Sequence, residues 1–166
     1  MIFISTLSGK DLAEKYPNIL SYKNNVDKDD SLVALELINE EFMEQTTDGG
    51  GELIGYYDSD SIVRKIEVTV YLSNGIQEYT YYLQNHKPLL IYDSFSQYRW
   101  DETMNSFDYT NFDLWFHGTY IFSDGELIDH ISLGHNRFED DEIDIEKTFK
   151  TECNYFLEKI LNEIRD

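Results

Sequence analysis

Residues 62–72 alternate between apolar and polar side chains, and this period of two constrains the fold more than any other feature of the chain. The apolar residues of one parity are Ile62, Ile66, Val68, Val70 and Leu72. Such alternation is the pattern of a half-buried β-strand. Asn74-Gly75, a strong hairpin signal, follows it, and residues 76–83 are rich in Tyr and Thr. The sequence therefore predicts an antiparallel hairpin with one face against a core.

Further turn sequences extend this hairpin into a larger sheet. They lie at residues 49–51, 85–88 and 124–125, and each precedes an apolar or aromatic run. Glycine, asparagine and aspartate tolerate the backbone conformations that tight turns require. We therefore predict an antiparallel β-meander of about six to eight strands over residues 31–132.

Residues 31–47 fit two different patterns. The apolar residues at helical spacing are Leu35, Ile38 and Phe42. Those that alternate as in a strand are Val33, Leu35 and Leu37. Both interpretations stay open. We favour a strand for the second half, because residues 48–51 then form a hairpin loop into the next strand.

The clearest helix is predicted over residues 143–165. Its apolar stripe is Ile145, Phe149, Cys153, Phe156, Ile160 and Ile164, with Asp144 as the expected N-cap. At the other end, residues 1–30 predict a short helix that Ser8 caps and Pro17 ends, with a charged connector from residue 24 to residue 30. The stripe must cover a sheet face, so the predicted fold class is α+β: a meander with a C-terminal amphipathic helix on one face, in one domain over residues 1–166.

The chain combines strong acidity with many aromatic residues. It has 13 Lys and Arg against 33 Asp and Glu, a formal net charge of −20, and it is 15% aromatic. The aromatic content argues against disorder. The charge disfavours nucleic acids and anionic membranes as partners and favours a cationic partner, either a basic protein face or a metal ion. Lone Cys153, the absence of a membrane-length apolar run and an N-terminus unlike a signal peptide predict a cytoplasmic protein.

No residue pattern typical of catalysis or cofactor binding occurs. The four histidines lack metal-ligand spacing, and Cys153 lies on the apolar helix stripe, as a buried hydrophobe would. The acids at 58 and 60 begin like a calcium loop, but Val63 stands where the required glycine should be. We therefore predict no catalytic residue, no metal and no cofactor. A pocket that raises the pKa of a carboxyl group would instead favour an enzyme.

Residues 93–116 combine aromatic and acidic side chains without a clean period, which is typical of a long binding segment. We expect Tyr98, Trp100 and Tyr109 to be its more exposed aromatic residues. The acids expected to bind a partner beside them are Asp101, Glu102, Asp108 and Asp113. A second acidic cluster precedes the C-terminal helix and consists of Glu139, Asp140, Asp141 and Glu142.

Three segments, at residues 50–58, 64–66 and 78–82, resemble small uncharacterised bacterial proteins built as antiparallel meanders. In its acidity, size and missing catalytic set, the chain is also similar to immunity proteins of bacterial toxin systems. That second resemblance implies a non-catalytic protein that binds a cognate cationic toxin and blocks it by occlusion.

Two other classes remain open. One is an inhibitor that mimics nucleic acid and binds a DNA-binding enzyme through regularly spaced carboxylates. The other is a secreted or periplasmic binding protein whose leader has been removed.

Overall fold

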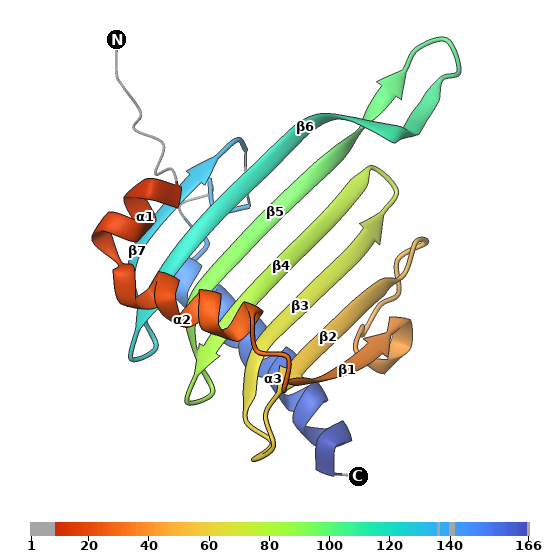
Figure 1. The fold of residues 1–166 in the computed structure, drawn as a ribbon. Helices are drawn as coiled ribbons and strands as arrows, with labels where there is room; N and C mark the ends of the chain where they lie inside the picture. Colours follow the sequence, from red (N-terminus) through yellow and green to blue (C-terminus); the bar gives the residue numbers. More distant parts are fainter. Residues whose placement is uncertain (1–8, 136, 140–141, 166) are drawn as a thin grey trace.

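The computed structural model describes residues 9–135, 137–139 and 142–165, in which seven strands form one antiparallel sheet in chain order. The strands are β1 (Val33–Ile38), β2 (Gly51–Tyr57), β3 (Val63–Leu72), β4 (Gly75–Gln84), β5 (Lys87–Asp101), β6 (Ser106–Ser123) and β7 (Glu126–Leu133). The helices are α1 (Gly9–Lys15), α2 (Pro17–Asp27), the 3-10 helix η1 (Asn39–Glu41) and α3 (Ile145–Arg165). Helix α3 lies behind one face of the sheet, and α1 and α2 cross one end of the other face (Figure 1). The predicted α+β meander with a C-terminal helix is confirmed.

Two of the tight turns follow from residues that tolerate positive φ. At residues 85–86 and 124–125, both central residues have positive φ, as a two-residue type I′ hairpin requires. The turn between β3 and β4 lies one residue earlier than predicted, because Leu72 pairs with Gly75 and so closes it.

The larger core lies between the sheet and α3. Phe149, Cys153 and Ile160 are fully buried at helical spacing on α3. Asp144 caps the helix as predicted, since its Oδ1 accepts a hydrogen bond from the Lys147 amide at 2.9 Å. Burial raises the pKa of the Cys153 thiol to about 12, so this cysteine is an inert core residue. No helix within the described residues is long and apolar enough to cross a membrane.

Gly55 of β2 lets α3 approach the sheet closely. A Cβ atom placed there would lie 2.6 Å from Ile160 Cδ1, well inside van der Waals contact. We expect Gly55→Ala to lower the free energy of unfolding by about 1–2 kcal/mol through overpacking. The double variant with Ile160→Ala should cost less than the sum of the two single changes, because the shortened side chain makes room. Urea denaturation measures this coupling, and strict additivity would contradict the contact.

The N-terminal helices form a smaller core on the opposite face. Its buried residues are Leu12, Tyr82, Leu90 and Ile121. Pro17 ends α1 as predicted, but it also begins α2, a position where its fixed φ and missing N–H suit a helix. The prediction of a connector from residue 24 is therefore wrong as far as Asp27, where α2 ends. The predicted cap, Ser8, lies outside the described residues.

The strand between residues 31 and 47 lies in the first half of that segment, not in the second half as predicted. The side chain of Asn39 turns the chain after β1, because its Oδ1 accepts a hydrogen bond from the Gly51 amide at 3.1 Å. Glu41 Oε2 accepts another from the amide of Ile38. Leu37 and Phe42 are buried in the larger core and Leu35 packs against it, so the strand alternation is confirmed for Leu35 and Leu37, and the helical spacing predicted for Phe42 is wrong. The long-range contact between Asn39 and Gly51 thus fixes the end of a strand in a segment whose local patterns disagreed.

Residues 93–116, expected to be irregular, instead continue the two longest strands. β5 has 15 residues and β6 has 18. They pair as far as Asp101 and Ser106, with register shifts on either side of Tyr98. At each register shift the alternation of side chains between the two faces of the sheet is interrupted. The apolar residues of this stretch therefore do not follow a fixed period of two.

Candidate protein-binding site

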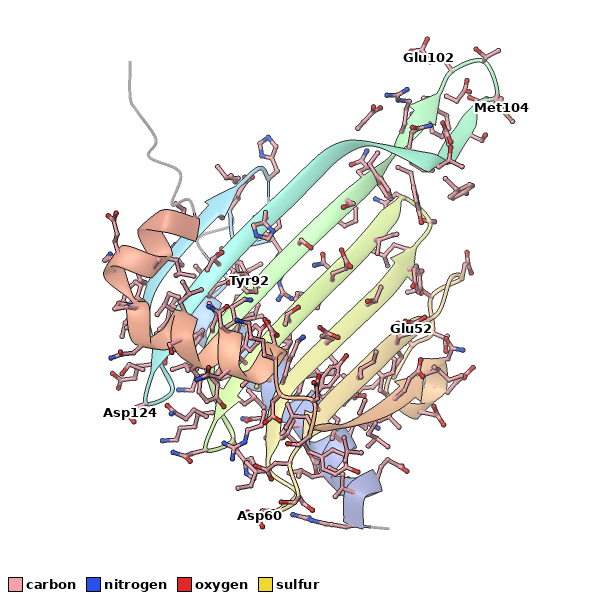
Figure 2. The ribbon with its side chains drawn as sticks, viewed as in Figure 1. Glu52, Asp60, Tyr92, Glu102, Met104 and Asp124 are labelled. Carbon is pink, nitrogen blue, oxygen red and sulfur yellow. The ribbon has the colours of Figure 1, made fainter. Side chains whose placement is uncertain are left out.

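The outer ends of β5 and β6 project from the sheet as a two-stranded hairpin. The neighbouring strand β4 begins at Gly75, which pairs with Gln97 of β5. On the other side, β7 reaches only the pair between Leu133 and His117. Residues 98–113, called the arm here, therefore extend beyond both neighbours (Figure 1). The side chains of Glu102 and Met104 lie at its tip (Figure 2).

The arm exposes an unusual share of large apolar side chains. Among the described residues eight such side chains are exposed, and four of them are Trp100, Met104, Tyr109 and Phe112. Trp100 is 47% exposed and Tyr109 is 64% exposed, which confirms the expected exposure of both. Tyr98 is only 8% exposed, so its expected exposure is wrong.

Ring contacts explain why Tyr98 is buried on a projecting hairpin. Its ring centroid lies 5.0 Å from that of Tyr109 and 5.3 Å from that of Phe112. Further out, Trp100 meets Phe107 edge to face at 5.1 Å. Cross-strand aromatic pairs of this kind stabilise a hairpin that has no core beneath it. The pairs therefore order the arm while its outer rings face solvent.

The four predicted acids of the arm differ in what they contact. Asp113 Oδ1 accepts a hydrogen bond from Arg99 Nε at 2.9 Å, and Asp101 Oδ1 accepts two backbone amide hydrogen bonds in the turn. Hydrogen bonds from the Thr110 and Asn111 side chains lower the pKa of Asp108 to about 2. Four acids and one arginine leave residues 98–113 with a net charge of −3.

The second predicted cluster is not brought onto the arm. Glu139 and Glu142 lie in the connection between β7 and α3. His135 Nδ1 lies 2.9 Å from a carboxylate oxygen of Glu139. Asp140 and Asp141 lie outside the described residues.

A small hollow, called the niche here, lies where the arm leaves the sheet. Its volume is 170 Å³, and it is lined by Gln77, Asp93, Phe95, Phe116, His135 and Arg137. Asp93 is 2% exposed, and burial raises the pKa of its carboxyl group to about 6. Arg137 holds Glu152 through two hydrogen bonds, at 2.5 and 2.8 Å. No second carboxylate therefore stands free beside Asp93 within the described part of the chain.

Sequence reasoning missed the niche, although one signal was available. Asp93 has the parity of Ile91 and Phe95 on β5, so a charged residue occupies a position where the pattern calls for an apolar one. No comparable signal identifies Arg137, which comes from the connection after β7.

Sequence reasoning also missed acids on the sheet face that α1 and α2 only partly cover. Glu52, Glu67 and Glu78 come from three neighbouring strands and line a hollow of 250 Å³. Figure 2 places Glu52 on this open part of the face. Lys65 Nζ lies 2.6 Å from Glu67, and the Tyr56 hydroxyl donates to the same carboxylate at 2.8 Å. Strand pairing alone gathers these acids, since they are 11 to 26 positions apart in the sequence.

Within the described residues, no group of three or more His, Cys, Asp and Glu side chains could hold a metal ion. Comparison of the chain with models of protein families, with curated proteins and with solved structures found no match.

Proposed function

We propose that this chain is a non-catalytic binding protein whose arm occupies a basic surface of a partner protein, in the manner of an immunity protein that blocks a cationic toxin. The observation that carries this proposal is the arm. It presents four exposed apolar side chains and a net charge of −3 on one projecting hairpin. Exposed apolar residues gathered in one place mark interaction sites.

The two kinds of arm residue have different roles in the proposed complex. Trp100 and Tyr109 are of the residue types that dominate binding energy when they enter a partner's pocket. The acids around them favour encounter with a basic face and disfavour wrong partners. Strand β5 continues from Tyr98 to Asp101 before the turn, and at about 3.4 Å per residue these four residues reach about 14 Å beyond the sheet. A hairpin of that reach can fill a cleft and exclude a substrate.

The charge also favours a different protein over a second copy of this chain. Two copies would each bring a net charge of −20, and like-charge contacts between arms cost free energy. A basic partner would instead neutralise the arm. The cytoplasm is the proposed compartment, because the one cysteine of the sequence is buried and has no partner for a disulfide within the chain.

A nucleic-acid mimic is a second candidate, supported by the acids of the open sheet face. Glu52, Glu67 and Glu78 supply one carboxylate per strand, but Glu52 and Glu78 flank Thr69 in one cross-strand row, and Glu67 lies two residues further along β3. Neighbouring strands are about 4.8 Å apart, so no two of these glutamates are direct cross-strand neighbours. Duplex DNA carries one charge per about 1.7 Å of its axis. The face is therefore sparser in charge than DNA, and Lys65 neutralises part of it. We rank the arm above this face for that reason.

Co-expression with the product of the adjacent gene tests the proposal. The expected result is relief of that product's toxicity and a complex that survives purification. If no toxicity is relieved and no complex forms, the proposed function is wrong.

The arm is tested with two matched double variants. Trp100→Ala with Tyr109→Ala removes exposed arm side chains, whereas Val33→Ala with Ile128→Ala removes similarly exposed apolar side chains elsewhere. We expect the arm variant to weaken the complex more than tenfold and the control to change it less than about threefold, since hot spots are local. Calorimetric titration measures both affinities, and thermal denaturation checks that both variants fold. Equal losses in the two variants would remove the arm as the binding site.

A further inference from the structure

Asp93 is a buried acid for which the described residues supply no ion-pair partner. Among the described residues, none of the ion pairs includes it. Its Oδ1 accepts a hydrogen bond from Gln77 Nε2 at 2.7 Å, and its Oδ2 accepts none of the hydrogen bonds found in the described part of the chain. Buried carboxylates are ordinarily paired, because desolvation of a lone charge is costly.

Arg137, which also lines the niche, is paired with another acid through its terminal nitrogens, while its Nε has no hydrogen-bond partner among the described residues. Both terminal nitrogens of Arg137 donate to Glu152. The guanidinium group also lies over the rings of Tyr79, Phe138 and Phe149, at 4.8 to 5.2 Å from their centroids. It is therefore held toward α3. Asp93, Glu152 and Arg137 together carry a net charge of −1, which one monovalent cation would neutralise.

The walls of the niche suit a cation with an apolar stem. Phe95 and Phe116 line it, and aromatic faces attract ammonium and guanidinium groups. Gly118 pairs with Asp93 across β5 and β6 and adds no side chain of its own. The hydroxyl of Tyr120 lies over Gly118, is buried and has no hydrogen-bond partner among the described residues. The niche thus combines aromatic walls with a buried acid that has no ion pair among the described residues, and the Tyr120 hydroxyl interacts electrostatically with that acid from nearby.

We propose that the niche binds the side-chain cation of an arginine or lysine that the partner inserts at the base of the arm, with Asp93 as its counter-ion. This inference rests on the proposed function for the identity of the partner. A volume of 170 Å³ equals about five or six water molecules at about 30 Å³ each. That space fits a guanidinium or an ammonium group with its last methylene.

Small cations test the niche without any partner. We would titrate the whole protein with methylguanidinium, methylammonium and acetate at about pH 7.5, recording amide signals by NMR. The expected result is a saturable shift of the Gln77 side-chain amide and of the Asp93 and His135 backbone amides, with Kd on the order of millimolar for so small a ligand. The stronger of the two cations identifies the preferred side chain.

Two matched variants localise the binding. Asp93→Asn should weaken cation binding at least tenfold. Asp60→Asn, which removes the same charge from an exposed turn at the other end of the sheet (Figure 2), should change it less than twofold. The absence of saturable shifts, equal affinity in Asp93→Asn, or tighter binding of acetate would each overturn the proposal.

A pH series gives a second readout. Because the pKa of Asp93 is about 6, the affinity for the cation should fall as the pH drops from about 7.5 to about 5. The other charged or titratable groups that face Asp93 are Tyr79, Tyr120, His135, Arg137 and Glu152. The same pH series on the Asp93→Asn variant measures the share of these other groups. Because no partner is present, this experiment can fail while the arm test succeeds, and the reverse.

Discussion

Asp93→Asn is expected to stabilise the folded protein by about 3 kcal/mol at about pH 8, with a gain that vanishes near pH 4. Burial raises the folded-state pKa of Asp93 from 3.8 to about 6, so the folded protein binds this proton more tightly than the unfolded chain does. The favourable contribution of the protonated carboxyl group is complete below about pH 4 and is lost as the pH rises through about 6. Asparagine has nearly the same shape as the protonated carboxyl group and stays uncharged at every pH.

Urea denaturation of the natural protein and of Asp93→Asn, in steps from about pH 4 to about pH 8, measures this difference. Other acids act in the opposite direction, since hydrogen bonds from Lys15 and Tyr16 lower the pKa of Asp129. Their effects are common to both proteins and cancel in the difference. A difference that stayed constant with pH would contradict the raised pKa, and so would a loss of stability at high pH.

Phe149→Ala is expected to lower the free energy of unfolding by about 3–5 kcal/mol. The ring is fully buried where α3, the sheet and the connection after β7 meet. Its centroid lies 4.5 Å from that of Tyr120 and 5.2 Å from that of Phe138, and Arg137 lies over its face. Removing the ring leaves a cavity and also removes a surface on which the Arg137 side chain packs.

The same substitution on the arm is the control for this prediction. Phe112 is 46% exposed, so Phe112→Ala should cost no more than about 1 kcal/mol. Urea denaturation of both variants at one pH makes the comparison. Equal costs would mean that α3 is not held by the core described above.

The elements that sequence reasoning located well are those whose signals are local. The period of two in β3 and the stripe of α3 each arise within one element, because a core on one side imposes the pattern. The segments that were predicted wrongly either have no strong apolar face of their own or pack against residues that are distant in the sequence. Helix α2 has a weak apolar face, and its last residues were interpreted as a connector because asparagine and charged side chains dominate them.

The candidate site likewise has features that the local sequence predicts and features that depend on the tertiary structure. Composition alone identified Trp100, Tyr109 and the acids around them, because aromatic and acidic residues crowd into one stretch. Nothing in that stretch predicts its projection, which depends on where the neighbouring strands β4 and β7 stop. The interpretation of Tyr98 as exposed was wrong because its two ring partners come from the opposite strand of the arm.

By itself, then, the sequence determined an acidic, aromatic-rich α+β meander, since charge, turn residues and hydrophobic period are properties of the chain alone. Only the tertiary structure decided that residues 98–113 form an arm and that Asp93 is buried beside Arg137. The physical reason is separation along the chain: Asp93 and Arg137 are 44 positions apart. A carboxyl group becomes a buried acid with a raised pKa only when the fold removes water from around it.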